Sequence, residues 1–164
     1  MADVMVPKET QGDLAEAGAR RALTGFYRAM DCGDMDAMLA CCHPEMVWER
    51  RGEVLRGADD FRRAQASKSS TLLAHHLILN FTAQASSADR ADFETLVLAI
   101  RSDSGEAPAM PQSPGYMSMH RCTGTAICDD DGQWRLIHYR PETPDMDAGT
   151  IGPTQFFAWP GQAG

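Results

Sequence analysis

Apolar residues recur every three or four positions through the first third of the chain, which is the spacing of one helix face. The pattern predicts a helix over about 13–32, a short second helix after Asp34, and a third over about 58–67. Asp34 is a favoured N-cap residue type, and Pro44 is expected to end the second helix. The apolar face of the first helix comprises Leu23, Phe26, Tyr27 and Met30. The corresponding face of the second comprises Met35, Met38, Leu39 and Cys42.

Beyond residue 69 apolar and polar positions alternate, which is the period of a half-buried strand. Two short strands are expected earlier, over 45–50 and 54–56. The run of three aspartates and a glycine at 129–132 is typical of a hairpin turn. Helices that precede an antiparallel sheet define the α+β class. The long strands of this sheet are expected over 72–84, 91–101, 116–128 and 133–140.

The length of 164 residues indicates one domain with a single core. We expect a loose arm over 1–12, the folded domain over 13–140, and an irregular tail over 141–164. The tail contains a cluster of aromatic residues that is costly to leave in water. It is therefore expected to pack on the domain or on a second subunit.

The chain is acidic, with 23 Asp and Glu against 15 Lys and Arg and a net charge of −8. Such a surface repels phosphate groups, so neither nucleic acid nor an anionic membrane is an expected partner. No apolar run is long enough for a membrane span, and the N-terminus has no secretory pattern, so a cytoplasmic location is expected. The five cysteines and the histidines lack metal-ligand spacing, and no glycine-rich phosphate loop precedes a helix. No metal and no other cofactor is expected.

Two segments carry candidate chemistry. Tyr27 and Asp31 lie four residues apart on the first helix and share its face. His76 lies in a predicted strand, where alternation places it on one face with Ile78 and Asn80. Structural alternatives remain open at this point: Asp31 would cap the following turn or face solvent, and His76 would be an ordinary core or surface residue. The opposite, outer face of that strand is expected to carry His75, Leu77, Leu79 and Phe81.

Four stretches match those of a known family: FYRAMDCGDMD at 26–36, VWE at 47–49, HLILN at 76–80 and DGQWRL at 131–136. Together with the order of elements, they resemble the SnoaL-like branch of the nuclear transport factor 2-like (NTF2-like) superfamily, which includes scytalone dehydratase, lindane dehydrochlorinase, bile-acid 7α-dehydratase and polyketide cyclases. The resemblance implies a cone, in which a bent, mostly antiparallel sheet curls around three helices and encloses an apolar pocket. It covers most of 13–140, although this fold hosts many unrelated functions.

The resemblance implies roles for particular residues. His76 and Asp31 fall at the positions of a pocket histidine and aspartate, and Trp48 falls at that of a pocket tryptophan. Arg140 falls near a pocket arginine, and Thr123 replaces an asparagine. Tyr27, Arg121, Thr123 and Arg140 are candidates to stabilise developing negative charge. Asn80 and Phe26 are expected to contact substrate, and a rim salt bridge is the alternative for Arg140.

A neutral imidazole held by a carboxylate is suited to abstract a proton near neutral pH. We therefore expect a cofactor-independent lyase or isomerase (dehydratase, isomerase or cyclase type) acting on a hydrophobic cyclic or aromatic molecule. The alternative is a non-catalytic binding module, or the small subunit of a ring-hydroxylating dioxygenase. The apolar outer face of the strand at 72–84 favours a homodimer, with a trimer as the alternative.

Overall fold

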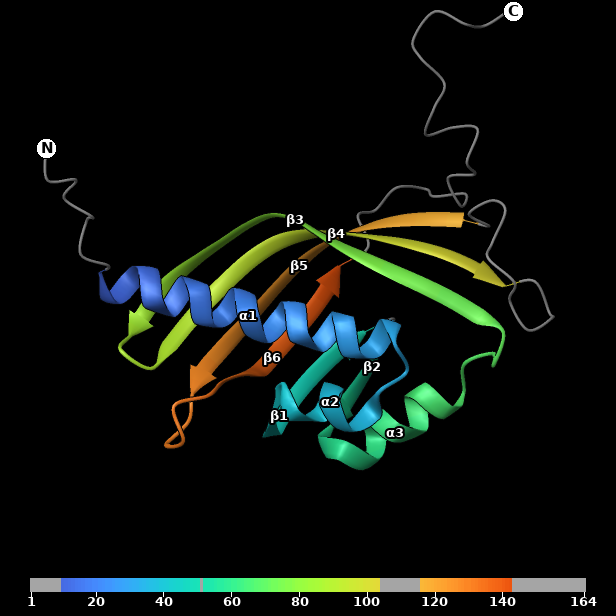
Figure 1. Cartoon of the computed structure of the whole chain (residues 1–164), viewed down its shortest axis with the longest axis horizontal. Helices are drawn as coiled ribbons and strands as arrows, with labels where there is room; N and C mark the ends of the chain where they lie inside the picture. Colours follow the sequence, from blue (N-terminus) through green and yellow to red (C-terminus); the bar gives the residue numbers. More distant parts are fainter. Residues whose placement is uncertain (1–9, 51, 104–115, 143–164) are drawn as a thin grey trace, which may run out of the picture.

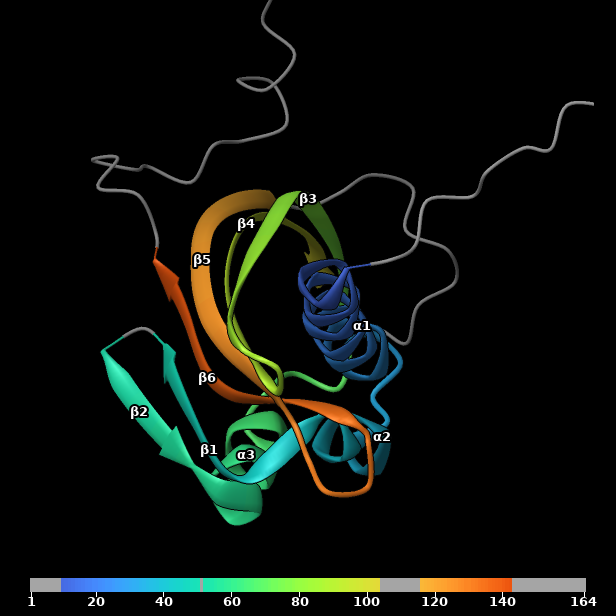
Figure 2. The ribbon, with the colours of Figure 1, turned by 90° about the vertical axis from the view of Figure 1, so that its left-hand side faces the viewer.

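The computed structural model describes residues 10–50, 52–103 and 116–142. A mixed sheet curves around one long helix, as Figures 1 and 2 show. The helices are α1 (Gln11–Asp31), α2 (Met35–Ala40) and α3 (Gly57–Ala66). The strands are β1 (Cys42–Arg50), β2 (Glu53–Arg56), β3 (Leu72–Ser87), β4 (Arg90–Asp103), β5 (Tyr116–Cys128) and β6 (Trp134–Glu142).

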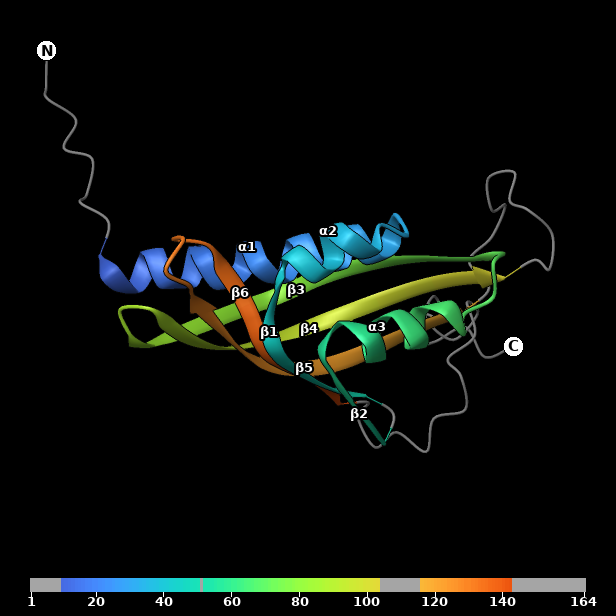
Figure 3. The ribbon, with the colours of Figure 1, turned by 90° about the horizontal axis from the view of Figure 1, so that it is seen from below.

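The sheet has the strand order β2-β1-β6-β5-β4-β3. Neighbouring strands pair antiparallel except β1 and β6, which pair parallel. The expected α+β cone, with an antiparallel meander after the helices, is confirmed. Figure 3 shows the same arrangement from below, with α3 following β2; α3 packs against β1 and β2. No helix within the described ranges is long and apolar enough to cross a membrane.

The core lies between α1 and the concave face of the sheet. Leu23 and Phe26 of α1 are fully buried, together with Leu136 and Tyr139 of β6. The interval of three residues between Leu23 and Phe26 places both on the helix face that meets the sheet. The apolar stripe predicted for the first helix therefore forms the centre of the core.

Helix α1 begins two residues earlier than expected. The Thr10 hydroxyl accepts a hydrogen bond from the Asp13 backbone N–H, and the Asp13 carboxylate accepts one from the Thr10 N–H. This capping box satisfies amide groups that the first turn of a helix leaves free. The expected arm over 1–12 is thus wrong for residues 11 and 12, while residues 1–9 lie outside the described part of the chain.

The second helix is shorter than predicted. It ends at Ala40, and Cys42 already belongs to β1, so Pro44 lies within a strand and does not end the helix. The physical reason is the parallel pairing of Cys42 with Leu136 of β6, a contact across the chain that local spacing does not reveal. Asp34 does cap α2, because its carboxylate accepts the Ala37 N–H.

A bulge changes the alternation of β3. The register with β4 shifts between Leu79 and Thr82, and Asn80 has a positive φ of 49°. His75, Leu77 and Leu79 are exposed, as expected for the outer face, but Phe81 is buried, so that part of the prediction is wrong. An extra residue in one strand reverses the faces that follow it. The homodimer expected from this outer face stays a prediction.

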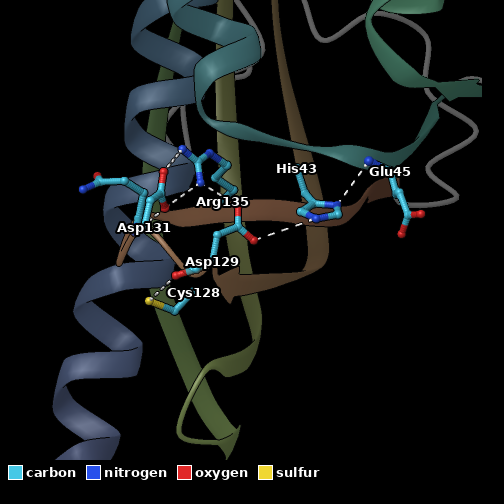
Figure 4. A network of polar contacts seen from close by, with 7 residues as sticks. His43, Glu45, Cys128, Asp129, Asp131 and Arg135 are labelled. Carbon is cyan, nitrogen blue, oxygen red and sulfur yellow. Dashed lines mark hydrogen bonds and ion pairs between the residues drawn. The ribbon is translucent and has the colours of Figure 1, made fainter.

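The hairpin between β5 and β6 is fixed by ionic contacts, as Figure 4 shows. Arg135 donates to Asp131 at 2.9 and 2.7 Å and to Asp129 at 2.5 Å. Asp129 also lies 3.8 Å from a ring nitrogen of His43, which connects the hairpin to β1. The hydrogen bonds from Arg135 and from the Gln133 N–H lower the pKa of Asp131 to about 2.

Replacing Asp131 with asparagine should lower stability at neutral pH, and the difference from wild type should shrink in acid. The pKa of the carboxyl is depressed in the folded state, so its contribution is complete above the unfolded pKa of about 3.9 and is lost as pH falls through about 2. Urea unfolding at about pH 7 and about pH 3 measures both values. Asp130→Asn, which removes the neighbouring exposed carboxylate, is the control. A difference between Asp131→Asn and wild type that is the same at both pH values would contradict the assignment.

Candidate active site

The end of α1 and the first half of β3 bring Asp31 and His76 together. Asp31 Oδ1 lies 2.5 Å from His76 Nδ1, and Asp31 Oδ2 accepts the His76 backbone N–H at 2.8 Å. The imidazole is 7% exposed and the carboxylate 15%, so little water screens their contact. Asp31 is the last residue of α1, where the helix dipole disfavours an anion. Hydrogen bonds to both carboxylate oxygens offset that cost.

This geometry selects one tautomer of the imidazole. A carboxylate only accepts hydrogen bonds, so Nδ1 carries the proton that bonds to Asp31. Nε2 then has a free lone pair, and no described residue is hydrogen-bonded to it. His76 therefore combines a fixed ring with an available basic nitrogen.

Tyr27 packs against the imidazole from α1. Its ring stacks on His76 with centroids 4.5 Å apart and an interplanar angle of 26°. Its hydroxyl lies 2.6 Å from the hydroxyl of Tyr139 on β6. Burial, the largest effect, raises the pKa of Tyr27 well above its usual range, although the bond to Tyr139 and the charge of Arg101 act in the opposite direction. Tyr27 therefore stays a neutral phenol that holds the His76 ring in place.

His76 lines a cavity of about 280 Å³ inside the cone. This is slightly below the ~300 Å³ at which typical ligand pockets begin, so a molecule of one or two rings would fill it. The apolar part of the wall combines aromatic rings, aliphatic side chains and a methionine. Its lining residues are Tyr27, Met30, Trp48, Arg50, Ser67, Lys68, Leu72, Ala74, His76, Arg101, His120 and Pro141.

Three residues of this cavity were singled out from the sequence: His76, Tyr27 and Trp48. Asp31 is not among the residues that line this cavity; it borders a second, open hollow between α1 and β3, which Tyr27 and His76 also line. Phe26 is fully buried and packs edge-on against Trp48, with ring centroids 5.3 Å apart. It supports the Trp48 ring and is not among the lining residues.

The remaining candidates lie elsewhere. Asn80 is exposed at the bulge of β3. Arg121 is exposed and forms an ion pair with Glu94 at 3.0 Å. Thr123 lines a separate open hollow of about 560 Å³ on the sheet. Arg140 is half exposed and pairs with Glu142 at 3.1 Å and with Glu49 at 3.9 Å.

The sequence interpretation missed five polar residues of the cavity: Arg50, Ser67, Lys68, Arg101 and His120. The buried positions of β4 alternate through Val97 and Ala99, and Arg101 is the next position on that face. His120 of β5 lies opposite Val97 of β4, so its side chain is on the same face of the sheet. Extending the alternation of β4 by one step would have found Arg101 from the sequence. No cluster of histidine, cysteine or acidic residues that could hold a metal occurs among the described residues.

The comparisons with known proteins agree with this fold. A family model for the SnoaL-like domain matches residues 23–105. No curated protein matches the chain. A Novosphingobium aromaticivorans protein provisionally described as a scytalone dehydratase has a similar structure, with a TM-score of 0.68, 15% identity, and 85% of this chain and 91% of that chain covered.

Two further structures show the same architecture. One is a ketosteroid isomerase-like protein from Erwinia carotovora atroseptica, with a TM-score of 0.62, 15% identity, and 79% of this chain and 96% of that chain covered. The other, from Novosphingobium aromaticivorans, is provisionally described as an aromatic ring hydroxylase, with a TM-score of 0.65, 17% identity, and coverage of 84% and 94%. At these identities the structures support the fold alone. Because the family model spans half of the chain, the protein belongs to the SnoaL-like domain family of the NTF2-like superfamily.

Proposed function

We propose that this protein is a cofactor-independent lyase or isomerase that acts on a hydrophobic cyclic or aromatic small molecule. The proposal is carried by one observation: a carboxylate-bound histidine lines a partly apolar cavity. Membership of the SnoaL-like family supports the same class, since one structural neighbour is provisionally described as a scytalone dehydratase and another as a ketosteroid isomerase-like protein.

The chemistry begins with proton transfer to His76. A C–H bond of the substrate, acidified by a neighbouring carbonyl group, gives its proton to Nε2, and its electron pair forms an enolate. The imidazolium that results is stabilised by Asp31, 2.5 Å from Nδ1. The Nε2 proton then passes to a leaving hydroxyl group, which departs as water, or to another carbon of the enolate. The first outcome is elimination and the second is isomerisation.

The cavity wall favours a flat apolar substrate. Trp48 is 4% exposed, and Phe26 and Phe61 pack edge-on against its ring. A ring held in this way is rigid and forms a fixed aromatic part of the cavity wall. Together with the stacked Tyr27–His76 pair, it sets aromatic rings around the cavity near the basic nitrogen.

The alternative, a binding module without catalysis, is tested by the same experiment. Two-ring ketones such as 2-tetralone are incubated with the protein in D₂O, and the loss of the α-proton signal is followed by NMR. Wild type should accelerate exchange, and a His76→Gln/Asp31→Asn double variant should not. The proposal would be contradicted, and the binding module favoured, if exchange is equally fast with both proteins. The same holds if wild type accelerates exchange for none of the two-ring ketones.

A further inference from the structure

The outer face of the sheet, turned away from α1 in Figure 2, carries an apolar patch. Leu77 and Leu79 of β3 lie on this face and are 41% and 37% exposed. In β4, Leu98 lies opposite Leu77 and Leu96 lies opposite Leu79, and side chains that are opposite one another share a face. The pairing of β4 with β3 and β5 extends the same face to further apolar residues. We call this surface the outer patch; its members are Leu77, Leu79, Leu96, Leu98, Ile100 and Met119.

The outer patch is continuous and has a defined border. Its members on β4 and β5 are half buried, so apolar atoms reach the surface on three neighbouring strands. On one side the patch ends at the exposed ion pair between Arg121 and Glu94, 3.0 Å apart. Beyond the bulge of β3 the same face becomes polar, with Thr82 and Thr123 on either side of Glu94. Contiguous apolar surface is costly to leave in water, so it indicates a place where other apolar groups pack.

Strand β6 ends close to the outer patch. Glu142, the last residue of β6, pairs with Arg121, and Arg121 pairs with Leu96 of the patch. These three residues lie in one row across β6, β5 and β4. Neighbouring strands are about 4.8 Å apart, so the end of β6 lies roughly 10 Å from Leu96. The chain therefore leaves the described sheet beside this patch.

The sequence that follows Glu142 contains groups that match the outer patch. Phe156, Phe157 and Trp159 follow one another closely, and no charged residue follows Asp147. These positions lie outside the described ranges. A linker of about 14 residues separates Glu142 from Phe156, and such a linker spans roughly 20 Å as a random coil and about 40 Å or more when extended. Residues 156–159 can therefore reach every part of the patch.

We infer that residues 156–159 dock on the outer patch of their own chain, with the aromatic rings packed against Leu77 and Leu79. A single contact then removes two apolar surfaces from water, the patch and the aromatic segment. The inference is independent of the proposed function, because Leu77 and His76 lie on opposite faces of β3.

A second copy of the chain is the alternative occupant, since the homodimer expected from the sequence would use the same face. The tether favours the chain's own segment. A flexible linker of this length holds its segment at an effective concentration on the order of millimolar, far above that of a second copy in a micromolar solution. The aromatic segment therefore outcompetes a second copy for the patch.

Fluorine NMR of protein labelled with 5-fluorotryptophan tests the docking. The chain has three tryptophans, and Trp159→Phe identifies the signal of Trp159. In wild type this signal should differ from its position in urea, and it should lack most of the shift between H₂O and D₂O that an exposed indole shows. Leu77→Glu, which places a charge in the patch, should restore that solvent shift. Val54→Glu adds the same charge at another exposed apolar residue, on the opposite edge strand β2, and should leave the signal unchanged.

A shortened chain keeps the test decisive if Leu77→Glu does not fold. A chain that ends at Ala148 retains every described residue and uncovers the outer patch, so binding of the dye anilinonaphthalene sulfonate should rise several-fold. Unchanged dye binding would overturn the inference, as would a Trp159 signal that is solvent-exposed in wild type or responds equally to both glutamate variants. Protection of Trp159 that appears only as a dimer forms, followed by sedimentation velocity over a range of concentrations, would also overturn it and assign the patch to a second copy.

Discussion

Replacing His76 with glutamine should lower the rate of proton exchange by about 10²–10⁴-fold, the usual contribution of one general base. Glutamine keeps a polar side chain that can bond to Asp31, but it has no basic nitrogen at the position of Nε2. The cavity keeps its shape, because Tyr27 is held by Tyr139 as well as by the imidazole. Substrate affinity should therefore change much less than turnover, and steady-state kinetics with the ketone that wild type exchanges fastest measures both.

His75 supplies a matched control. It precedes His76 in β3, but it is exposed on the outer face and is not among the cavity residues. His75→Gln should retain the wild-type rate. A similar loss in the two variants would show that the effect comes from the strand and not from the base, and full activity in His76→Gln would contradict the mechanism.

Replacing Asp31 with asparagine should lower the proton-exchange rate nearly as much as His76→Gln does, by up to about 10⁴-fold, because it changes the tautomer of His76. Asp31 offers two acceptor oxygens, one to the His76 backbone N–H and one to Nδ1. Asparagine has only one oxygen, and if this accepts the backbone N–H, its amide N–H₂ faces Nδ1. The imidazole then accepts at Nδ1 and carries its proton on Nε2, where the base is needed.

The tautomer can be read directly by ¹⁵N NMR of histidine-labelled protein. In its neutral form, the His76 imidazole of wild type should show a protonated Nδ1 and a free Nε2, and that of Asp31→Asn should show the reverse. Asp34→Asn, at the exposed cap of α2, is the control and should leave the His76 signals unchanged. A neutral wild-type imidazole that carries its proton on Nε2 would contradict the proposed role of Asp31.

Local patterns were sufficient for most of the fold. The spacing of Leu23, Phe26 and Tyr27 identified the buried face of α1, and alternation gave the bounds of β5 as the structure has them. The start of β1 was missed because it depends on parallel pairing with β6, a contact across more than half of the chain. The burial of Phe81 was not predicted, because nothing in the alternation of apolar and polar residues marks the bulge that precedes it.

The site shows the same division between local and distant information. The geometry of His76 and Asp31 follows from a helix face and a strand face that the sequence displays. Arg140 was expected near the pocket, but its position beside Glu49 depends on the pairing of β6 with β1, which local spacing does not contain. The position of Arg101 could have been predicted from the sequence, because it continues the buried alternation of β4. It was not predicted, because a charged residue near the end of a strand is usually solvent-exposed.

The most direct test of the central claim is a double-mutant cycle on the exchange rate. His76→Gln, Asp31→Asn and the double variant are compared with wild type at one pH and one ketone concentration. If Asp31 acts only through His76, the double variant should be no slower than His76→Gln alone, so the two losses are strongly non-additive. Losses that simply multiply, or a His76→Gln variant as active as wild type, would contradict the assignment of these two residues as a proton-transfer dyad.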